Sequence, residues 1–182
     1  MTSEEGDHTA FAAELSNLTG RLELLVLHLA GPALRRRVGV DDLVQDVVLG
    51  LLASEHARGL CGDELWRHAR LSARRTVVDA ARRLRHAPRR ATSVVQSGSG
   101  PSVVSARTAS GPGPGTLAAG AEEHARLVAA FDSLAPEHRR VIGFRRFEGL
   151  SAAETGAKMG RSEGAVHSLL RRALAAWAES IE

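Results

Sequence analysis

Hydrophobic residues along this chain recur three or four positions apart, which is the spacing of one face of an α-helix. In the first such stretch Leu18, Leu22, Leu25 and Leu29 follow one another at this spacing. Gly31-Pro32 comes soon after them, and proline interrupts or kinks a helix because it lacks the backbone N–H. The pattern predicts an all-α fold whose first helix is interrupted near residue 31.

A second helix is predicted to begin near Asp41, whose carboxylate is a good N-terminal cap. Its apolar face consists of Leu43, Val44, Val47, Val48 and Leu51. Leu49 falls instead on the opposite face, among Asp42, Gln45 and Asp46. A single apolar side chain on a surface is common, whereas a leucine beside carboxylates favours a surface for a partner. The pattern leaves both interpretations open.

The third predicted helix, over residues 65–85, combines a core stripe with a dense basic surface. The stripe consists of Trp66, Ala69, Ala73, Val77, Ala80 and Leu84. Around it lie Arg67, Arg70, Arg74, Arg75, Arg82, Arg83 and Arg85. These arginines are either a solvated face or a surface for a polyanion.

Glycine, proline and serine are concentrated in residues 91–120, and such a composition cannot bury enough apolar surface to offset the entropy of ordering. We therefore predict a flexible linker there. It joins two small helical domains, at residues 13–90 and 121–182. Residues 1–12 are predicted to be a flexible N-terminus.

Beyond the linker the pattern predicts an amphipathic helix over residues 122–134 and a following helix with Pro136 in its first turn. Ser151 begins a capping box with the glutamate three positions later, which marks the start of a short helix. Gly160 is suited to end that helix, and Ser162 is suited to cap the next one. Two helices joined by so tight a turn form either an ordinary αα-corner or a DNA-binding helix-turn-helix.

Charge is segregated along the chain although the formal net charge is only +3. Residues 1–66 carry 5 basic and 11 acidic side chains, whereas residues 67–90 carry 9 arginines against Asp79 alone. Residues 121–182 carry 9 basic and 9 acidic side chains. Concentrated positive charge favours nucleic acid as a partner. The excess of arginine over the single Lys158 is also what a GC-rich coding sequence produces.

Cys61 is the single cysteine, so no internal disulfide and no thiolate metal cluster can form within the chain. The eight histidines lack metal-ligand spacing, and neither a glycine-rich nucleotide loop nor a nucleophile motif is present. We therefore expect no enzymatic activity and no bound metal or cofactor. The N-terminus lacks a signal-peptide pattern, and no apolar run is long enough to span a membrane. These features predict a cytoplasmic protein that does not bind membranes.

Three motifs of the second domain resemble region 4 of the extracytoplasmic-function sigma factors, which belong to the sigma-70 family. They are residues 134–141 (LAPEHRRV), 146–151 (RFEGLS) and 160–166 (GRSEGAV). In the first domain, residues 41–47 (DDLVQDV) resemble region 2.2 and residues 74–83 (RRTVVDAARR) resemble region 2.4 of the same family. Because the motifs follow the family's order, the resemblance favours a helix-turn-helix over an αα-corner.

The resemblance implies a sigma factor that binds core RNA polymerase and directs it to promoter DNA. In such a factor the helix over residues 162–177 reads the minus 35 element in the major groove. Its residues expected to face the DNA are Ser162, Glu163, Gly164, His167, Ser168, Arg171 and Arg172. Family members often carry Lys or Arg in place of His167, and a mostly neutral imidazole contributes less to phosphate binding.

Two further surfaces are implied by the same resemblance. Contacts to the minus 10 element are expected from Arg74, Arg75, Asp79, Arg82 and Arg83. Contacts to the β′ coiled coil of the polymerase are expected from Asp42, Gln45, Asp46 and Leu49. The polymerase β subunit is a further expected partner, and the resemblance leaves an anti-sigma factor open. Trp66 is the one aromatic residue between Phe11 and Phe131, so no set of stacking residues for strand opening is evident.

The two promoter elements lie two to three helical turns apart in this family, roughly 70 to 100 Å at about 34 Å per turn. A flexible linker of this length spans roughly 30 Å, so it must be stretched or guided when both elements are bound. Two other interpretations remain open. One is a helix-turn-helix regulator that recruits no polymerase, and the other is an adaptor in which both domains bind protein.

Overall fold

The structure is a computed structural model that describes residues 2–86 and 114–181, with side chains placed for residues 10–86 and 122–181. All regular structure in these ranges is helical, which confirms the predicted all-α fold class. The helices form a first half, residues 2–86, and a second half, residues 114–181. Most of the predicted linker lies outside the described residues.

Three long helices build the first half: α1 (Thr2–Leu29), α3 (Val40–Ala53) and α5 (Gly62–His86). Two short helices, α2 (Pro32–Arg35) and α4 (Glu55–Arg58), connect them. The three long helices contact one another pairwise. Leu22 of α1, Leu51 of α3 and Leu65 of α5 are fully buried between them. The predicted break after the first leucine stripe therefore falls between α1 and α2.

Helix α1 begins at Thr2, although the sequence predicts a flexible segment over residues 1–12. Phe11 and Leu15 are buried, at 6% and 2% exposure. They continue the stripe of Leu18 and Leu22 toward the N-terminus at the same helical spacing. The buried face of α1 thus begins at Phe11, before the first leucine of the predicted stripe at Leu18.

The second half contains α6 (Pro114–Ser133), α7 (Pro136–Ile142), α8 (Ala152–Met159) and α9 (Glu163–Glu179). Helix α6 begins inside the segment that the sequence assigns to the linker. Its first residues include Leu and Ala, which favour helix once a proline has started it. Pro136 does occupy the first turn of α7, as predicted.

A π-helix, η1 (Gly143–Phe147), continues α7 and was not predicted. The backbone N–H of Glu148 closes it by donating to the carbonyl of Gly143 at 2.8 Å. Such wide turns interrupt α-helices mainly at functional sites. Here the wide turn precedes Glu148 directly, at the point where the second half meets α1.

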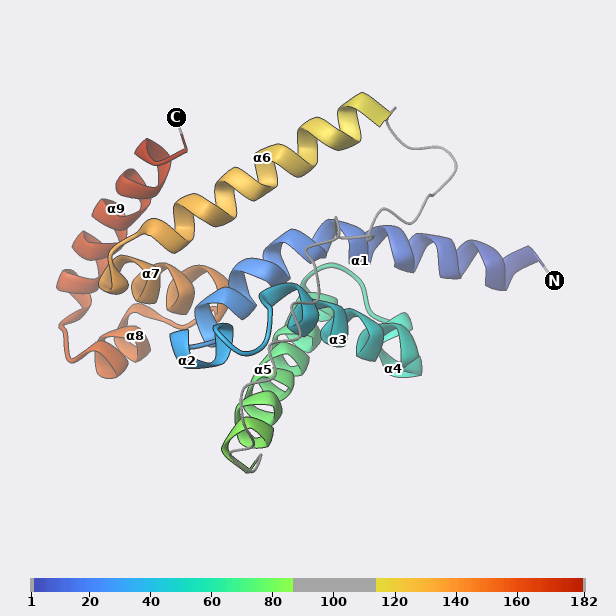
Figure 1. The fold of residues 1–182 in the computed structure, drawn as a ribbon, viewed down its shortest axis with the longest axis horizontal. Helices are drawn as coiled ribbons and strands as arrows, with labels where there is room; N and C mark the ends of the chain where they lie inside the picture. The colour runs from blue at the N-terminus through green and yellow to red at the C-terminus, as the bar shows by residue number, and fades with distance from the viewer. Residues whose placement is uncertain (1, 87–113, 182) are drawn as a thin grey trace.

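The two halves pack against each other, with α1 in contact with both α6 and η1. Figure 1 shows α1 crossing the centre of the molecule, with α5 on one side of it and α6 on the other. Buried side chains of both halves, among them Leu25, Phe131 and Ile142, belong to one continuous apolar cluster. Full burial of a side chain of this size stabilises a fold by about 1.5–3 kcal/mol. The sequence predicts the two groups of helices but not their contact.

The turn between α8 and α9 fixes the angle of the last helix. Gly160 has φ 66° and ψ 39°, the left-handed conformation that glycine adopts without strain, and its N–H donates to the carbonyl of Gly156. The Ser162 side chain accepts from the N–H of Ala165, and the predicted capping box of Ser151 and Glu154 is present at the start of α8. These features confirm the predicted turn.

Gly156 lies where α8 and the turn approach most closely. A Cβ atom on this residue would lie 2.5 Å from the backbone carbonyl oxygen of Arg161, so the turn would have to move. We expect Gly156→Ala to lower the free energy of unfolding by about 1–3 kcal/mol through this overlap, despite the better helix propensity of alanine. Gly50→Ala is the matched control, because no atom lies within 4 Å of its Cβ position in α3. It should raise the free energy of unfolding by about 0.5–1 kcal/mol, measured by urea denaturation. A stabilised Gly156→Ala variant would contradict this geometry.

Thr155 lies next to this turn and is fully buried, at 0% exposure. Its hydroxyl oxygen has no hydrogen-bond partner in the described part of the chain. Because a buried polar group without a partner costs about 1–3 kcal/mol, we expect Thr155→Val to raise the free energy of unfolding by about 1 kcal/mol. The same urea titration measures it, and Thr155→Ser, which keeps the hydroxyl but loses a methyl group, should destabilise.

Candidate nucleic-acid interface

Helix α9 presents one face to the core and the other to solvent. Val166, Leu169 and Ala173 are buried at 2% exposure or less and pack against the rest of the second half. All seven residues expected to face DNA are exposed: Ser162, Glu163, Gly164, His167, Ser168, Arg171 and Arg172. Within the described residues neither Arg171 nor Arg172 makes an ion pair. Both guanidinium groups therefore have their donors available for an anionic partner.

The C-terminal part of α9 is fixed by aromatic contacts with α6 that the sequence did not reveal. The indole N–H of Trp177 donates to the carbonyl of Leu127 at 3.2 Å. The ring centroids of Phe131 and Trp177 are 5.3 Å apart, and those of Phe131 and Phe147 are 5.5 Å apart. Aromatic pairs at such distances stabilise beyond simple burial. Helix α6 thus serves as the support on which α9 is oriented.

The acidic face of α3 forms a second exposed surface. Asp42, Gln45, Asp46 and Leu49 are all exposed, and Leu49 shows 56% of its surface. Leu52, 40% exposed, lies beside them and was not singled out from the sequence. Two exposed leucines within one acidic stripe are a better candidate for a protein contact than one.

The arginines of α5 do not share one environment. Arg75, Asp79, Arg82 and Arg83 are exposed. The one ion pair among them, between Arg82 and Asp79 at 3.8 Å, is solvent-exposed and contributes little. Arg74 differs, because its guanidinium donates to the carboxylate of Glu148 in the second half. The structure therefore leaves four of the five expected minus 10 residues without a partner in the second half, and the fifth, Arg74, is 52% exposed while paired with Glu148.

Trp66 is not a stacking residue in this conformation. Its side chain is buried at 5% exposure, and the guanidinium carbon of Arg21 lies 4.0 Å from its ring centroid. The tryptophan is part of the core between α1 and α5.

In the described residues no group of three or more His, Cys, Asp or Glu side chains is arranged to hold a metal ion. The rings of His56 and His68 contact each other edge to face, with centroids 5.3 Å apart. Among the described helices, none is both long and apolar enough to cross a membrane.

A family model described as sigma-70, region 4 matches residues 130–176, from the end of α6 to most of α9. This part of the chain is thus similar to region 4 of the sigma-70 family. It is 43% identical over 60 residues to an RNA polymerase sigma-E factor of Streptomyces antibioticus, which covers 33% of each chain. It is 42% identical over 64 residues to an RNA polymerase sigma-E factor of Streptomyces avermitilis, covering 34% of this chain and 36% of the relative. The chain thus spans about a third of the length of the curated relatives it matches.

The match confirms the resemblance to region 4 that the motifs of the second half indicate. The buried and exposed faces of α9 are those expected of the second helix of a helix-turn-helix. The individual contact residues on α9, α5 and α3 remain predictions.

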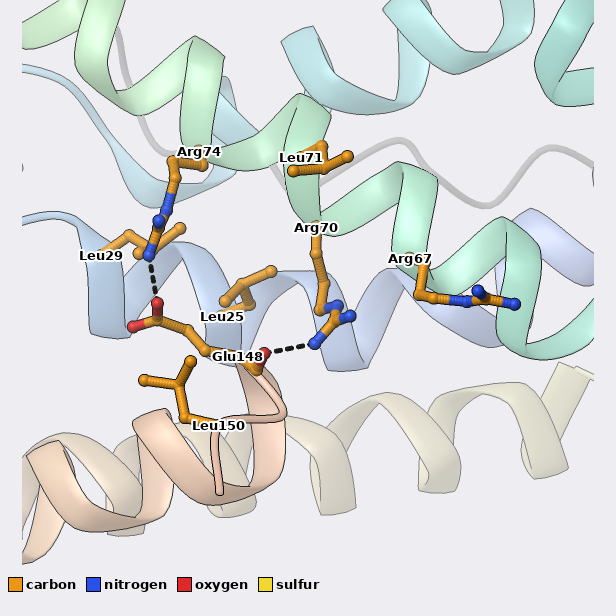
Figure 2. A pocket seen from close by; sticks show the side chains of 8 residues that line it. All are labelled: Leu25, Leu29, Arg67, Arg70, Leu71, Arg74, Glu148 and Leu150. Atoms are coloured by element: carbon orange, nitrogen blue, oxygen red, sulfur yellow. Dashed lines mark hydrogen bonds and ion pairs between the residues drawn. The ribbon is translucent and has the colours of Figure 1, made fainter. Parts of the chain in front are cut away.

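Sequence reasoning missed Glu148, a residue at which the two halves meet. The carboxylate of Glu148 accepts from His28 of α1 at 2.9 Å and from Arg74 of α5, and its backbone carbonyl accepts from Arg70. Figure 2 shows both arginines directed at Glu148, while Arg67 extends away from it. The His28 ring also contacts the backbone of Gly143 so closely that a side chain there would overlap it. Only the tertiary fold brings these groups together.

Glu148 lies at the rim of a cavity of about 260 Å³ between the halves. The cavity is lined by Leu25, Leu29, Arg67, Arg70, Leu71, Arg74, Glu148 and Leu150. Burial alone would raise the pKa of the Glu148 carboxyl. The hydrogen bond from His28 and the positive charge of Arg74 outweigh this effect, so its pKa lies below the ordinary 4.5.

This lowered pKa gives the packing of the halves a defined pH dependence. A carboxyl whose folded pKa is depressed contributes stability above its unfolded pKa of 4.5, and this contribution is lost as the pH falls through the folded value. We expect the free energy of unfolding of the wild type to fall more steeply below pH 4.5 than that of Glu148→Gln. Urea titrations of both proteins at pH 7 and at successively lower pH measure the difference. Parallel pH curves for the two proteins would show that the carboxylate contributes no such stability.

Proposed function

We propose that this protein is a transcription initiation factor that binds core RNA polymerase and directs it to specific promoters. The observation that supports this proposal best is the orientation of α9 within the residues that match region 4. Its buried face packs against α7 and α8 and its C-terminal part is held to α6 by Trp177, while its exposed face displays Arg171 and Arg172, which make no ion pair within the described residues. A helix presented in this way has the form required to enter the DNA major groove.

The minus 35 element is the proposed target of α9. A guanidinium offers paired donors that match guanine edges or phosphate oxygens, so Arg171 and Arg172 are assigned the main contacts. Glu163 at the exposed N-terminal end of the helix can accept from a cytosine amino group. Ser162, Gly164, His167 and Ser168 complete the facing surface.

The minus 10 element is the proposed target of α5. Arg75, Arg82 and Arg83 are exposed on a helix whose segment carries most of the chain's excess positive charge. Their attraction to phosphates is largely independent of base sequence and weakens with salt. Asp79 adds an acceptor to this surface, and Arg74, half exposed, lies on the same helix.

The acidic stripe of α3 is the proposed polymerase surface. Asp42, Gln45, Asp46 and Leu49 would contact the β′ coiled coil, with the second half contacting the β subunit. Two exposed leucines flanked by carboxylates support a protein rather than a nucleic-acid partner, because phosphates repel carboxylates. An anti-sigma factor would compete for these same surfaces. The chain itself is assigned no chemical step.

Transcription in vitro with purified core polymerase tests the proposal. Asp46→Ala should lower the affinity for core polymerase at least about tenfold, or 1.4 kcal/mol, because it removes a charge from the centre of the stripe. Arg171→Ala should leave core binding unchanged and lower transcription from the cognate promoter about tenfold or more, since a base or phosphate contact is worth about 1–3 kcal/mol.

Matched controls are Glu123→Ala for the acid and Arg126→Ala for the arginine, both exposed on α6. Neither should change core binding or promoter choice. A wild-type chain that binds promoter DNA but does not co-purify with core polymerase would instead identify a regulator that recruits no polymerase.

A further inference from the structure

The cavity of about 260 Å³ beside α5 has walls that are largely leucine. Leu25 and Leu29 come from α1, Leu71 from α5, and Leu150 from the segment between η1 and α8. Figure 2 shows Leu29 and Leu150 toward one end of the cavity and Arg67 toward the other. Apart from Arg74, no residue that lines the cavity is named for the proposed DNA or polymerase contacts.

The apolar wall of the cavity is open to solvent at Leu71. This leucine is 58% exposed, more than any other large apolar side chain placed in the structure. A single exposed leucine is common, but Leu71 lines the same cavity as Leu25, which is only 1% exposed. An apolar group that enters such a cavity leaves water, which is favourable. The leucine walls therefore suit an apolar chain.

Positive charge surrounds the same leucines. The ionisable residues that line the cavity are Arg67, Arg70, Arg74 and Glu148. The one carboxylate among them is already paired, because Glu148 contacts His28 and Arg74. The charge of the two remaining arginines is not offset within the cavity, so the cavity suits an anion.

Arg67 and Arg70 have donors left for such an anion. Arg67 is 62% exposed, and its ion pair with Glu64 is long, at 3.7 Å, and contributes little. Arg70 donates to the backbone carbonyl of Glu148 and makes no ion pair among the described residues. Gly149 leaves space for Arg70, since a Cβ atom there would lie 2.5 Å from its Nη1. Arg70 is thus already held in place, and a guanidinium pairs well with a carboxylate.

The volume of the cavity limits the size of the ligand. At about 30 Å³ per water molecule, 260 Å³ corresponds to about nine water molecules. Pockets for drug-sized ligands are larger, at about 300–1,000 Å³, so a nucleotide or a phospholipid exceeds this space. A linear carboxylate of about eight carbons has about ten non-hydrogen atoms and is of the right size.

We propose that this cavity binds a medium-chain aliphatic carboxylate, with the carboxylate at Arg67 and Arg70 and the chain among the four leucines. Leu150 belongs to the second half and the other leucines to the first, so the ligand contacts both halves. A ligand that binds only the folded protein stabilises it. The site uses no contact to DNA or polymerase and is therefore independent of the proposed function.

Calorimetric titration of the full-length protein with fatty-acid salts tests the site. Affinity should rise about fourfold for each methylene between butanoate and octanoate. It should not rise further for dodecanoate below its micelle concentration, because the cavity is then full. Acetate, which has the head group alone, and 1-octanol, which lacks the charge, should each bind at least about tenfold more weakly than octanoate. Octanoate should also raise the midpoint of thermal unfolding.

Two variants at exposed positions separate the head group from the chain. Arg67→Gln should lower the affinity for octanoate about fivefold or more and leave that for 1-octanol unchanged. Leu71→Asn should lower the affinity for octanoate and flatten the dependence on chain length. Matched controls are Arg85→Gln, exposed on α5, and Leu52→Asn, exposed on α3, and neither should alter octanoate binding. Far-UV circular dichroism checks that each variant remains folded.

Several results would overturn the proposal. They are the absence of octanoate binding to the wild type, an affinity that keeps rising beyond octanoate, and equal binding by the wild type, Arg67→Gln and Leu71→Asn. Displacement of octanoate by phosphatidylglycerol vesicles would likewise overturn the assignment to a free carboxylate. If octanoate binds as expected but the protein supports no transcription with core polymerase, the proposed function fails and the site stands.

Discussion

A carboxylate removed from water must be paired with cations or hydrogen-bond donors, and this constraint at Glu148 determines how the protein is assembled. The carboxyl group lies between α1 and α5 of the first half, although it belongs to the loop that follows η1 of the second. The wide turn of η1, the close packing of His28 on Gly143 and the orientation of Arg70 and Arg74 all serve this one contact. Glu148 thus joins the halves together with the continuous apolar cluster and the ion pairs of Asp132 and Glu23.

The same constraint divides the basic surface of α5 in two. Toward the second half, Arg74 pairs with the Glu148 carboxylate, and Arg70 donates to the backbone carbonyl of the same residue. Around the helix, Arg75, Arg82 and Arg83 remain exposed and repel one another. Helix α5 thus has arginines in contact with the second half and other arginines open to solvent. Helix α9 shows no such division, because its arginines have no partner among the described residues.

Local sequence patterns predicted the elements of the fold well, and long-range pairing was beyond them. The turn at Gly160 and the capping box at Ser151 were predictable because each depends on a few adjacent residues. The exposed and buried faces of α3 and α9 followed from helical periodicity. By contrast, the pair of His28 and Glu148 joins residues 120 positions apart, and nothing in either local sequence marks it. The indole contact of Trp177 with Leu127 was missed for the same reason.

The contact at Glu148 is ionic, although an apolar contact would suit its surroundings. Replacing a buried ion pair by well-packed apolar residues is often neutral or stabilising, so permanent association would be served at least as well by leucines at these positions. The surrounding cavity already has leucines on both sides, at Leu25 and Leu150. A carboxylate paired with an imidazole and a guanidinium instead makes a contact that weakens when the acid is protonated. Charge at this position therefore makes the packing of the halves depend on pH, as leucines would not.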